Sequence, residues 1–448
     1  MRNQSTLFSQ LWRSITLGIP LIATQLLGYA PTVIDTIMAG DDSPLTQASV
    51  GLAGQIYSMI FLFMLGTTIA ISATVSHYHG NGDARRIRRS FQQGLWLSIL
   101  LGVLTFFLVL LASNVPYWIG TVPNVAREAN HYLLVMAPGA AIFVVALSGR
   151  FFLEGMAHPR SNIIIQVSLL PVNIIGNYVF LTGWWIFPKL GVPGMALATI
   201  TTFILYALLL FYGIYRNPRW RNLRLFQSFA PIDWLQIRLL LKVGVPIAVA
   251  IVMEAGLFNV IGLIVSRDGE LITAANQIAL NLSGMMFMLP LGLSSAMTIR
   301  AANEQGRGDY RAVYHVALGG IILGVLLMCV SASVLISLRE SIAALYTDNA
   351  EIIGIVSSVL AIIAIFQIAD GTQVIAAGIL RGLQDTRVAM YFAILGYWIL
   401  GFPAGLTFAY VFDFGLYGLW GGLAVGLAIN AVLGSWRVFS LIKHKQST

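Results

Sequence analysis

The sequence predicts an all-α integral membrane protein with twelve transmembrane helices, arranged as two six-helix lobes related by a parallel pseudo-twofold repeat. Three observations predict this fold: the composition, the length of the apolar segments, and a similarity between the two halves of the chain. Of the 448 residues, 58% are hydrophobic and only 10% are charged, whereas soluble globular proteins carry about 25% charged residues. The composition therefore excludes a water-soluble domain and a disordered chain.

Apolar segments run almost from end to end of the chain. A transmembrane helix needs about 20 mostly apolar residues, and these segments are apolar on every face, unlike the alternating strands of about 10 residues in a membrane barrel. We therefore expect helices over residues 14–38, 48–76, 91–113, 130–155, 161–182, 191–215, 238–266, 274–300, 312–338, 350–378, 388–412 and 416–441.

The basic residues predict the orientation of these helices. Cytoplasmic loops of membrane proteins carry an excess of Lys and Arg, and all but four of the 26 fall on the side of both termini and the loops after even-numbered helices. We expect both termini on the cytoplasmic side of the cytoplasmic (inner) membrane. The formal net charge of +8 then reflects topology and does not indicate binding of nucleic acid.

A long polar segment near the midpoint divides the chain into an N-terminal lobe (1–215), a cytoplasmic linker (216–237) and a C-terminal lobe (238–448). A shift of 226 residues lays Gly80-Asn81-Gly82-Asp83-Ala84-Arg85 on Gly306-Arg307-Gly308-Asp309-Tyr310-Arg311 without a gap. Six helices per copy, an even number, let both copies enter the membrane in the same direction. Parallel repeats of this kind are typical of transporters that bind their substrate and coupling ion near the bilayer midplane.

Three carboxylates fall deep inside predicted helices, namely Asp35, Glu254 and Asp370. A carboxylate at the bilayer centre costs roughly 2.5 to 3.5 kcal/mol even on the mild insertion scale, and no Lys or Arg lies comparably deep in the predicted helices. We expect a mobile partner: a proton, a sodium ion or a cationic substrate. The alternative is that each carboxylate is protonated and hydrogen-bonded to backbone within its own half.

Glu254 and Asp370 are predicted to share one cation site. At 1.5 Å per helical residue, Glu254 lies roughly 18 Å beyond Lys242 and Asp370 roughly 16 Å from Arg381, both measured from the cytoplasmic side. The two carboxylates are therefore expected at the same depth. Such a pair suits a hard monovalent cation, and repulsion between the two charges also favours binding of a proton.

Asp35 is predicted to couple its charge to bending of the first helix, in which Pro20 and Pro31 each remove a backbone hydrogen bond. Asn173 and Asn177 are expected either to form a network with Asp35 or to bridge helices as structural amides. A second candidate polar network lies in the eighth predicted helix and consists of Asn276, Gln277 and Asn281.

Several motifs together resemble the multidrug and toxic compound extrusion (MATE) family, and within it the NorM-like branch. The resemblance spans about residues 14 to 441 and includes both Gly-x-Gly-Asp loops. The other motifs are Ile34-Asp35-Thr36 with Ala39-Gly40, Glu254, Ala275-Asn276-Gln277-Ile278-Ala279-Leu280-Asn281, and Asp370-Gly371-Thr372-Gln373-Val374 followed by Ala377-Gly378 and Leu380-Arg381-Gly382.

The resemblance implies a monomeric exporter without a cofactor, which exchanges cytoplasmic cationic drugs or dyes for inward-moving Na⁺ or H⁺. By position, Glu254 and Asp370 match the family's C-terminal-lobe carboxylates that bind the coupling cation. Asp35 matches the N-terminal-lobe acid linked to protonation and substrate, with Asn173 and Asn177 as its neighbours. Where some relatives place tyrosines near the cation, this sequence has Phe287 and Phe366, so two hydroxyl ligands of that pattern are missing.

Two other functions stay open. A flippase for a lipid-linked oligosaccharide would need cationic residues in its cavity, and none is evident. An intramembrane aspartyl protease needs two facing aspartates within helices, but Asp83 and Asp309 fall in predicted loops beside arginines, which favours turn formation. The sequence shows no metal-binding motif and no phosphate-binding glycine loop, so we expect transport to use an ion gradient and not ATP.

Overall fold

The computed structural model describes residues 7–184, 188–227, 229–265 and 269–447. Twelve helical segments within these ranges are long and apolar enough to cross a membrane, so the chain is a multi-pass membrane protein. Each contains one predicted span, although residue 266 of the span 238–266 lies outside the described residues. The described chain contains helices and no strands, and the predicted all-α class is confirmed.

The membrane-spanning helices have longer bounds than the apolar segments predict, because polar caps extend them at both ends. They are α1 (Leu7–Asp42), α2 (Pro44–Asn81), α3 (Ala84–Ala112), α5 (Pro123–Gly155), α6 (Arg160–Thr182), α7 (Val192–Arg216), α8 (Trp234–Val265), α9 (Glu270–Gly306), α10 (Tyr310–Ala344), α11 (Ala350–Gly382), a composite of α12 (Thr386–Ala393), η2 (Ile394–Gly401) and α13 (Phe402–Tyr410), and α14 (Gly415–Ser447). Two short helices, α4 (Val115–Trp118) and η1 (Pro218–Leu223), lie between spans.

The chain forms two compact units. Unit 1 comprises Met1–Gln25 with Val249–Thr448, and unit 2 comprises Leu26–Ala248. These bounds differ from the predicted lobes 1–215 and 238–448, because α1 and α8 each begin in one unit and end in the other. The predicted linker 216–237 lies entirely within unit 2.

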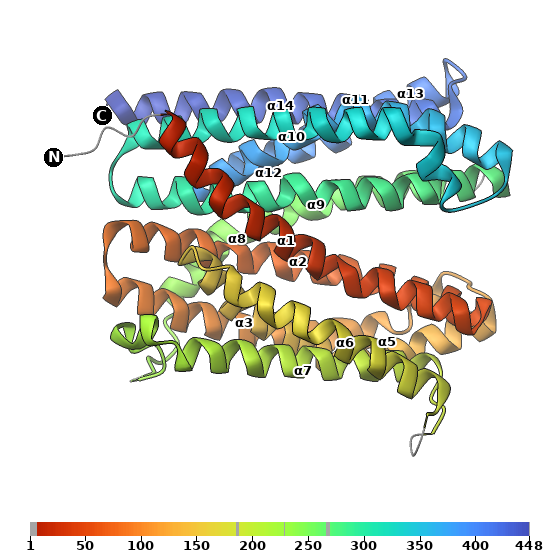
Figure 1. Ribbon diagram of the computed structural model, residues 1–448, viewed down its shortest axis with the longest axis horizontal. Helices are drawn as coiled ribbons and strands as arrows, with labels where there is room; N and C mark the ends of the chain where they lie inside the picture. Colours follow the sequence, from red (N-terminus) through yellow and green to blue (C-terminus); the bar gives the residue numbers. More distant parts are fainter. Residues whose placement is uncertain (1–6, 185–187, 228, 266–268, 448) are drawn as a thin grey trace. The chain divides into compact units, whose positions relative to one another are not determined.

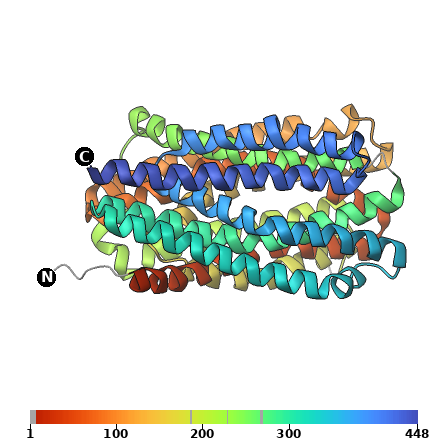
Figure 2. The same cartoon turned by 90° about the horizontal axis from the view of Figure 1, so that it is seen from above.

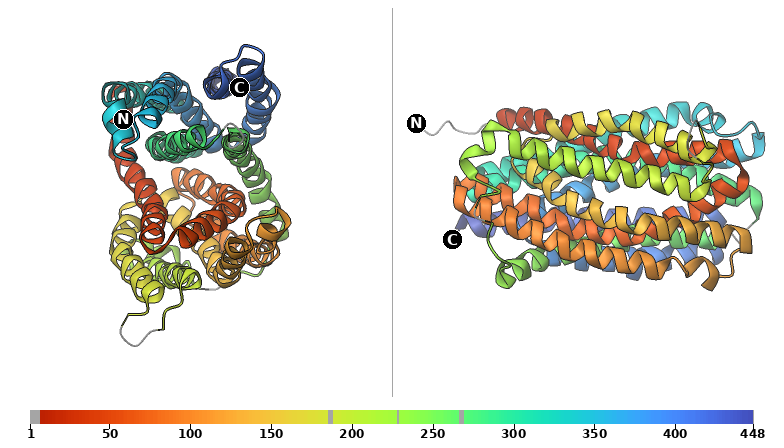
Figure 3. Two further views of the ribbon diagram at one scale, coloured as in Figure 1. Left: turned by 90° about the vertical axis from the view of Figure 1, so that its right-hand side faces the viewer. Right: turned by 90° about the horizontal axis from the view of Figure 1, so that it is seen from below.

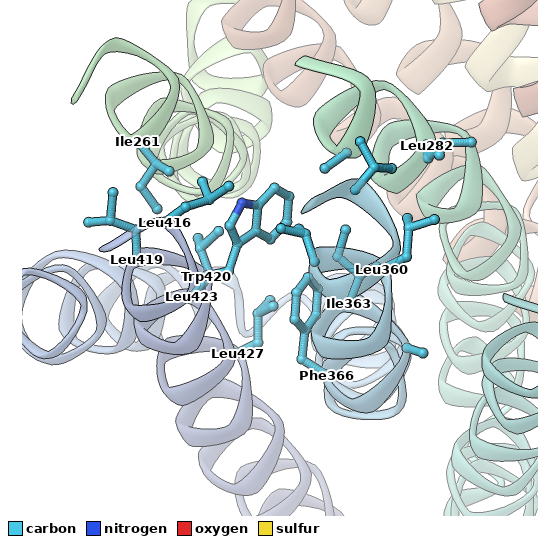
Figure 4. Close-up of a cluster of buried hydrophobic side chains, with 14 of the residues drawn as sticks. Ile261, Leu282, Leu360, Ile363, Phe366, Leu416, Leu419, Trp420, Leu423 and Leu427 are labelled. Carbon is cyan, nitrogen blue, oxygen red and sulfur yellow. The ribbon is translucent and has the colours of Figure 1, made fainter. Parts of the chain in front are cut away.

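In unit 1, α9, α10, α11 and α14 pack side by side (Figures 1 and 2). Their largest buried side chain is Trp420, whose ring is stacked on Phe366 with 6.0 Å between ring centroids. Figure 4 shows both rings surrounded by leucines and isoleucines of the same cluster. Phe366, at a position where a tyrosine would bring a hydroxyl, is thus part of the apolar core.

In unit 2, α2, α3, α5 and α7 form the corresponding bundle (Figure 3). The predicted linker is bound to this bundle by side chains of α3. Gln93 Nε2 donates to the carbonyl of Pro231 at 2.9 Å, and Trp96 Nε1 donates to the carbonyl of Ala230 at 3.0 Å. The segment between α7 and α8 is therefore a packed part of unit 2.

The internal repeat recurs as a repeat of close contacts. A Cβ atom added to Gly66 would lie 2.5 Å from Cα of Ala248, and one added to Gly292 would lie 2.4 Å from Cα of Ile22. Gly66 and Gly292 are repeat partners, and so are Ile22 and Ala248. The same approach between a glycine on one helix and the backbone of another therefore occurs once in each unit.

The two Gly-x-Gly-Asp motifs have the same local structure. Gly82 and Gly308 both have φ of +73°, a conformation that glycine adopts without strain. Asp83 then accepts a hydrogen bond from the backbone of Arg86 at 2.9 Å, and Asp309 accepts one from Ala312 at 3.0 Å. Both aspartates are helix N-caps, so the turn interpretation is confirmed and the protease alternative loses its proposed catalytic pair.

Candidate cation-binding site

The structure brings Glu254 of α8 and Asp370 of α11 to one side-chain amide. Nε2 of Gln373 donates to Oε1 of Glu254 at 2.8 Å and to Oδ1 of Asp370 at 3.3 Å. Asp370 and Gln373 are three residues apart and so lie on neighbouring faces of one helix; both are less than 10% exposed. Two acidic side chains therefore share one neutral donor inside unit 1.

Neither acidic side chain forms an ion pair with a basic residue in the described parts of the chain. Arg381 is the basic side chain that interacts with Glu254 over a longer distance, but its guanidinium donates to Oγ of Ser294 at 2.7 Å. The uncompensated charge is what a transported cation requires of its binding site.

Three arginines placed at the helix ends by sequence are buried. Arg150 is paired with Glu154 at 2.9 Å, Arg300 donates to Gln10 and Ser14, and Arg381 is bound to Ser294. Each has protein acceptors for its charge, so these residues give no support to a flippase that binds anionic headgroups. Their burial was not evident from the sequence, which indicated only their side of the membrane.

Two further polar residues lie at the carboxylates. The hydroxyl of Tyr397, on η2, lies beside the carboxylate of Glu254, and the amide of Asn430, on α14, lies beside that hydroxyl. Sequence reasoning missed both because neither is acidic and each stands in an apolar run. Gln373 could have been found, since it follows Asp370 by three residues within the same helix.

Asp35 lies in a separate polar group inside unit 2. Nδ2 of Asn177 donates to its Oδ1 at 2.6 Å, and Asn173 and Thr199 lie next to the same carboxylate. Asn173 and Asn177 are both fully buried. The structure thus brings the three residues of the predicted network together, while their role in coupling stays a prediction.

The first helix continues through both of its prolines, since α1 is helical from Leu7 to Asp42. Thr24 Oγ1 donates to the carbonyl of Pro20 at 3.0 Å, which adds a side-chain hydrogen bond next to the backbone bond that the ring removes. The predicted coupling between bending at Pro20 or Pro31 and the charge of Asp35 stays a prediction.

The three amides of α9 do not form one network. Asn276 accepts from Trp420 Nε1 at 3.0 Å, Asn281 accepts from the hydroxyl of Tyr346 at 3.0 Å, and Gln277 is exposed. Their different directions follow from the helical period, which separates successive side chains by about 100°. Asn276 therefore anchors the central tryptophan of unit 1.

Comparisons with known proteins identify the family. The MatE family model matches residues 20–179 and 246–407, two blocks that begin 226 residues apart, the offset of the internal repeat. A probable multidrug resistance protein NorM of Rhizobium meliloti is 35% identical over 438 residues, covering 96% of this chain and 93% of the relative. One from Xylella fastidiosa is also 35% identical and covers 96% and 92%.

Solved structures with the same fold have lower sequence identity. The eukaryotic MATE transporter AtDTX14 superposes with a TM-score of 0.89 at 18% identity, over 98% of this chain and 99% of the other. A MOP superfamily transporter from Pyrococcus furiosus superposes with a TM-score of 0.87 at 19% identity, over 99% and 98%. The family model and the curated relatives together show that the chain belongs to the MatE family, whose members are transporters and not enzymes.

Proposed function

We propose that this protein is a secondary active multidrug exporter of the NorM type. It exchanges cationic amphipathic drugs or dyes for inward-moving Na⁺ or H⁺ by alternating access, as a monomer in the cytoplasmic (inner) membrane with both termini in the cytoplasm. The names of the NorM relatives support the drug class, and the distribution of Lys and Arg supports the orientation.

One observation carries the proposal. Glu254 and Asp370 sit in membrane-spanning helices and are joined by a neutral amide, so each presents a negative charge with no fixed positive partner within hydrogen-bond distance among the described residues. Keeping such a pair inside a membrane is unfavourable unless a mobile cation binds it. A cation that enters from outside and leaves inside supplies the free energy for export of the drug.

The test uses the purified protein in lipid vesicles loaded with a fluorescent organic cation. An inward Na⁺ gradient or, separately, an inward proton gradient is imposed, and dye efflux is followed. We expect efflux under at least one gradient and its loss in Glu254→Gln and Asp370→Asn. The control is Asp413→Asn, which neutralises an exposed aspartate and should transport like the wild type. Absence of efflux under both gradients would contradict the antiport.

A further inference from the structure

A π-helical segment places a tyrosine hydroxyl at the carboxylates. Residues Ile394–Gly401 form this segment, η2, in the middle of a membrane span, and π-helical turns are frequent at functional sites. Trp398 Nε1 donates to the backbone carbonyl of Met253 at 3.0 Å, which fixes η2 to α8 one residue before Glu254. Tyr397, only 1% exposed, is thereby held beside the Glu254 carboxylate.

A glycine contact brings an amide to the same position. A Cβ atom added to Gly396 would lie 2.3 Å from Oδ1 of Asn430, so the absence of a side chain at 396 is what allows Asn430 of α14 to approach η2. Asn430 is 6% exposed and lies beside the hydroxyl of Tyr397. Two neutral oxygen-bearing groups from two helices therefore meet next to the acidic pair.

The polar atoms of both residues lack hydrogen-bond partners within the described ranges. These atoms are the hydroxyl of Tyr397 and both Nδ2 and Oδ1 of Asn430. Leaving a buried polar atom unsatisfied costs about 1 to 3 kcal/mol, so native structures rarely place several together without a use. Side by side and next to two carboxylates, they indicate a binding site for a group that accepts oxygen ligands.

We propose that Tyr397 and Asn430 supply two neutral oxygen ligands, a phenol hydroxyl and an amide carbonyl, to a sodium ion that Glu254 and Asp370 attract. The inference rests on the proposed cation-coupled export and names the ion that drives it. Hard cations bind several oxygen ligands at once, whereas a proton needs only one carboxylate oxygen. Two carboxylates alone would suffice for protons, and the neutral oxygens matter only to a metal ion.

The position of Phe366 agrees with this assignment. Its ring is stacked on Trp420 in the apolar cluster, where a hydroxyl would be buried among hydrocarbon. The hydroxyl of Tyr397 comes from a different helix and approaches Glu254 from η2. The ligand set of this chain thus has its hydroxyl on the span Thr386–Tyr410 and not on α11.

The experiment measures thermal unfolding of the purified protein against NaCl, with choline chloride holding the ionic strength constant. Binding of an ion to the folded state raises the unfolding temperature, and the midpoint of the rise reports affinity for Na⁺. We expect Tyr397→Phe and Asn430→Leu each to raise the midpoint concentration about tenfold, as the loss of one ligand worth about 1.4 kcal/mol predicts. Tyr391→Phe is the matched control, because Tyr391 lies on the same span but is 61% exposed.

Vesicle transport separates the outcomes. With the inference correct, Tyr397→Phe raises the Na⁺ concentration needed for half-maximal efflux and leaves any proton-driven efflux unchanged. A wild type that Na⁺ does not stabilise, or a folded Tyr397→Phe with the wild-type midpoint, would overturn the inference. Should Asn430→Leu not fold, Tyr397→Phe decides alone, because it removes one buried oxygen and no carbon. If Glu254→Gln retains gradient-driven efflux, the proposed function itself fails.

Discussion

Gln373 and Glu254 lie 119 positions apart in the chain, and the amide of the first donates to the carboxylate of the second at 2.8 Å. The same Nε2 also donates to Asp370, so one amide group provides a hydrogen for each acidic side chain. A bound cation would take over this role. Gln373 is therefore expected to stabilise the acidic pair while no cation is bound to it.

Replacement of this amide should destabilise the protein in a manner that cations reverse. Gln373→Leu leaves two carboxylates facing each other without a donor, and hydrogen bonds to charged groups contribute about 1.5 to 3 kcal/mol each. We expect a lower unfolding temperature at neutral pH and low Na⁺, with recovery as Na⁺ rises or pH falls. Thermal unfolding in detergent measures both.

The matched control lies almost two turns earlier on the same helix. Gln367 is 3% exposed, and neither polar atom of its amide has a partner among the described residues. Removing an unsatisfied buried amide is close to neutral, so Gln367→Leu should not lower the unfolding temperature. Equal losses in the two variants would show that Gln373 acts only through packing.

Asp35 and Asn177 should show energetic coupling in a double-mutant cycle. Asn177→Leu removes the donor at 2.6 Å from Asp35 and should cost about 1 to 3 kcal/mol in the wild-type background. In the Asp35→Asn background the same replacement should cost much less, because the charge is gone. The measurement is chemical or thermal unfolding of the four proteins of the cycle.

A parallel cycle with Asn173 is the control. Asn173 is also fully buried but forms no hydrogen bond of ordinary geometry to Asp35, so its coupling energy should be smaller. A coupling of zero between Asp35 and Asn177 would contradict the predicted network.

Helical spans and deep acids could be predicted from the sequence because both follow from the bilayer as solvent. Twenty apolar residues and a buried carboxylate are exceptional against water and lipid respectively, and each is recognisable without knowing its neighbours. The pairing of Glu254 with Asp370 was predictable from depth alone. Their connection through Gln373 emerges only from the structure, although the spacing of three residues within α11 contained the signal.

Tyr397 and Asn430 could not be predicted, because their importance depends on contacts between helices. An apolar run that contains one tyrosine is an ordinary membrane helix by composition, and nothing in it indicates π-helical turns at Ile394–Gly401. The position of Asn430 depends on Gly396 in another span. The bounds of the two compact units were also unpredictable, since the repeat marks where copies begin and not which helices pack together.

Asp233 gives a pH dependence outside the membrane spans. The hydrogen bond from Arg89 holds the pKa of this carboxyl below its usual range, and its Oδ1 also accepts from the backbone of Leu235 at 3.1 Å as α8 begins. A lowered pKa means that the charged form stabilises the fold above the ordinary value of about 3.9. That contribution is lost as the pH falls through the lowered pKa.

The comparison is between the wild type and Asp233→Asn, which keeps an oxygen for the cap but removes the charge. We expect the wild type to unfold at a higher temperature from about pH 5 to 8, with the difference disappearing at more acidic pH. Arg89→Met should lower the unfolding temperature over the same range. A difference that persists unchanged in acid would show that the amide disrupts the cap itself.

The repeated glycine contacts predict equal sensitivity at two distant positions. Gly66→Ala would place a Cβ 2.5 Å from the backbone of Ala248, and Gly292→Ala would place one 2.4 Å from Ile22. Backbone atoms cannot rotate away as a side chain can, so each variant should lose about 1 to 3 kcal/mol through overpacking. Gly54, on α2 like Gly66, has nothing within 4 Å of an added Cβ, and Gly54→Ala should gain about 0.5 to 1 kcal/mol as a helical glycine replaced by alanine. Thermal unfolding of the three variants in one detergent measures the set, and tolerance of alanine at only one of the two repeat positions would contradict the equivalence of the contacts.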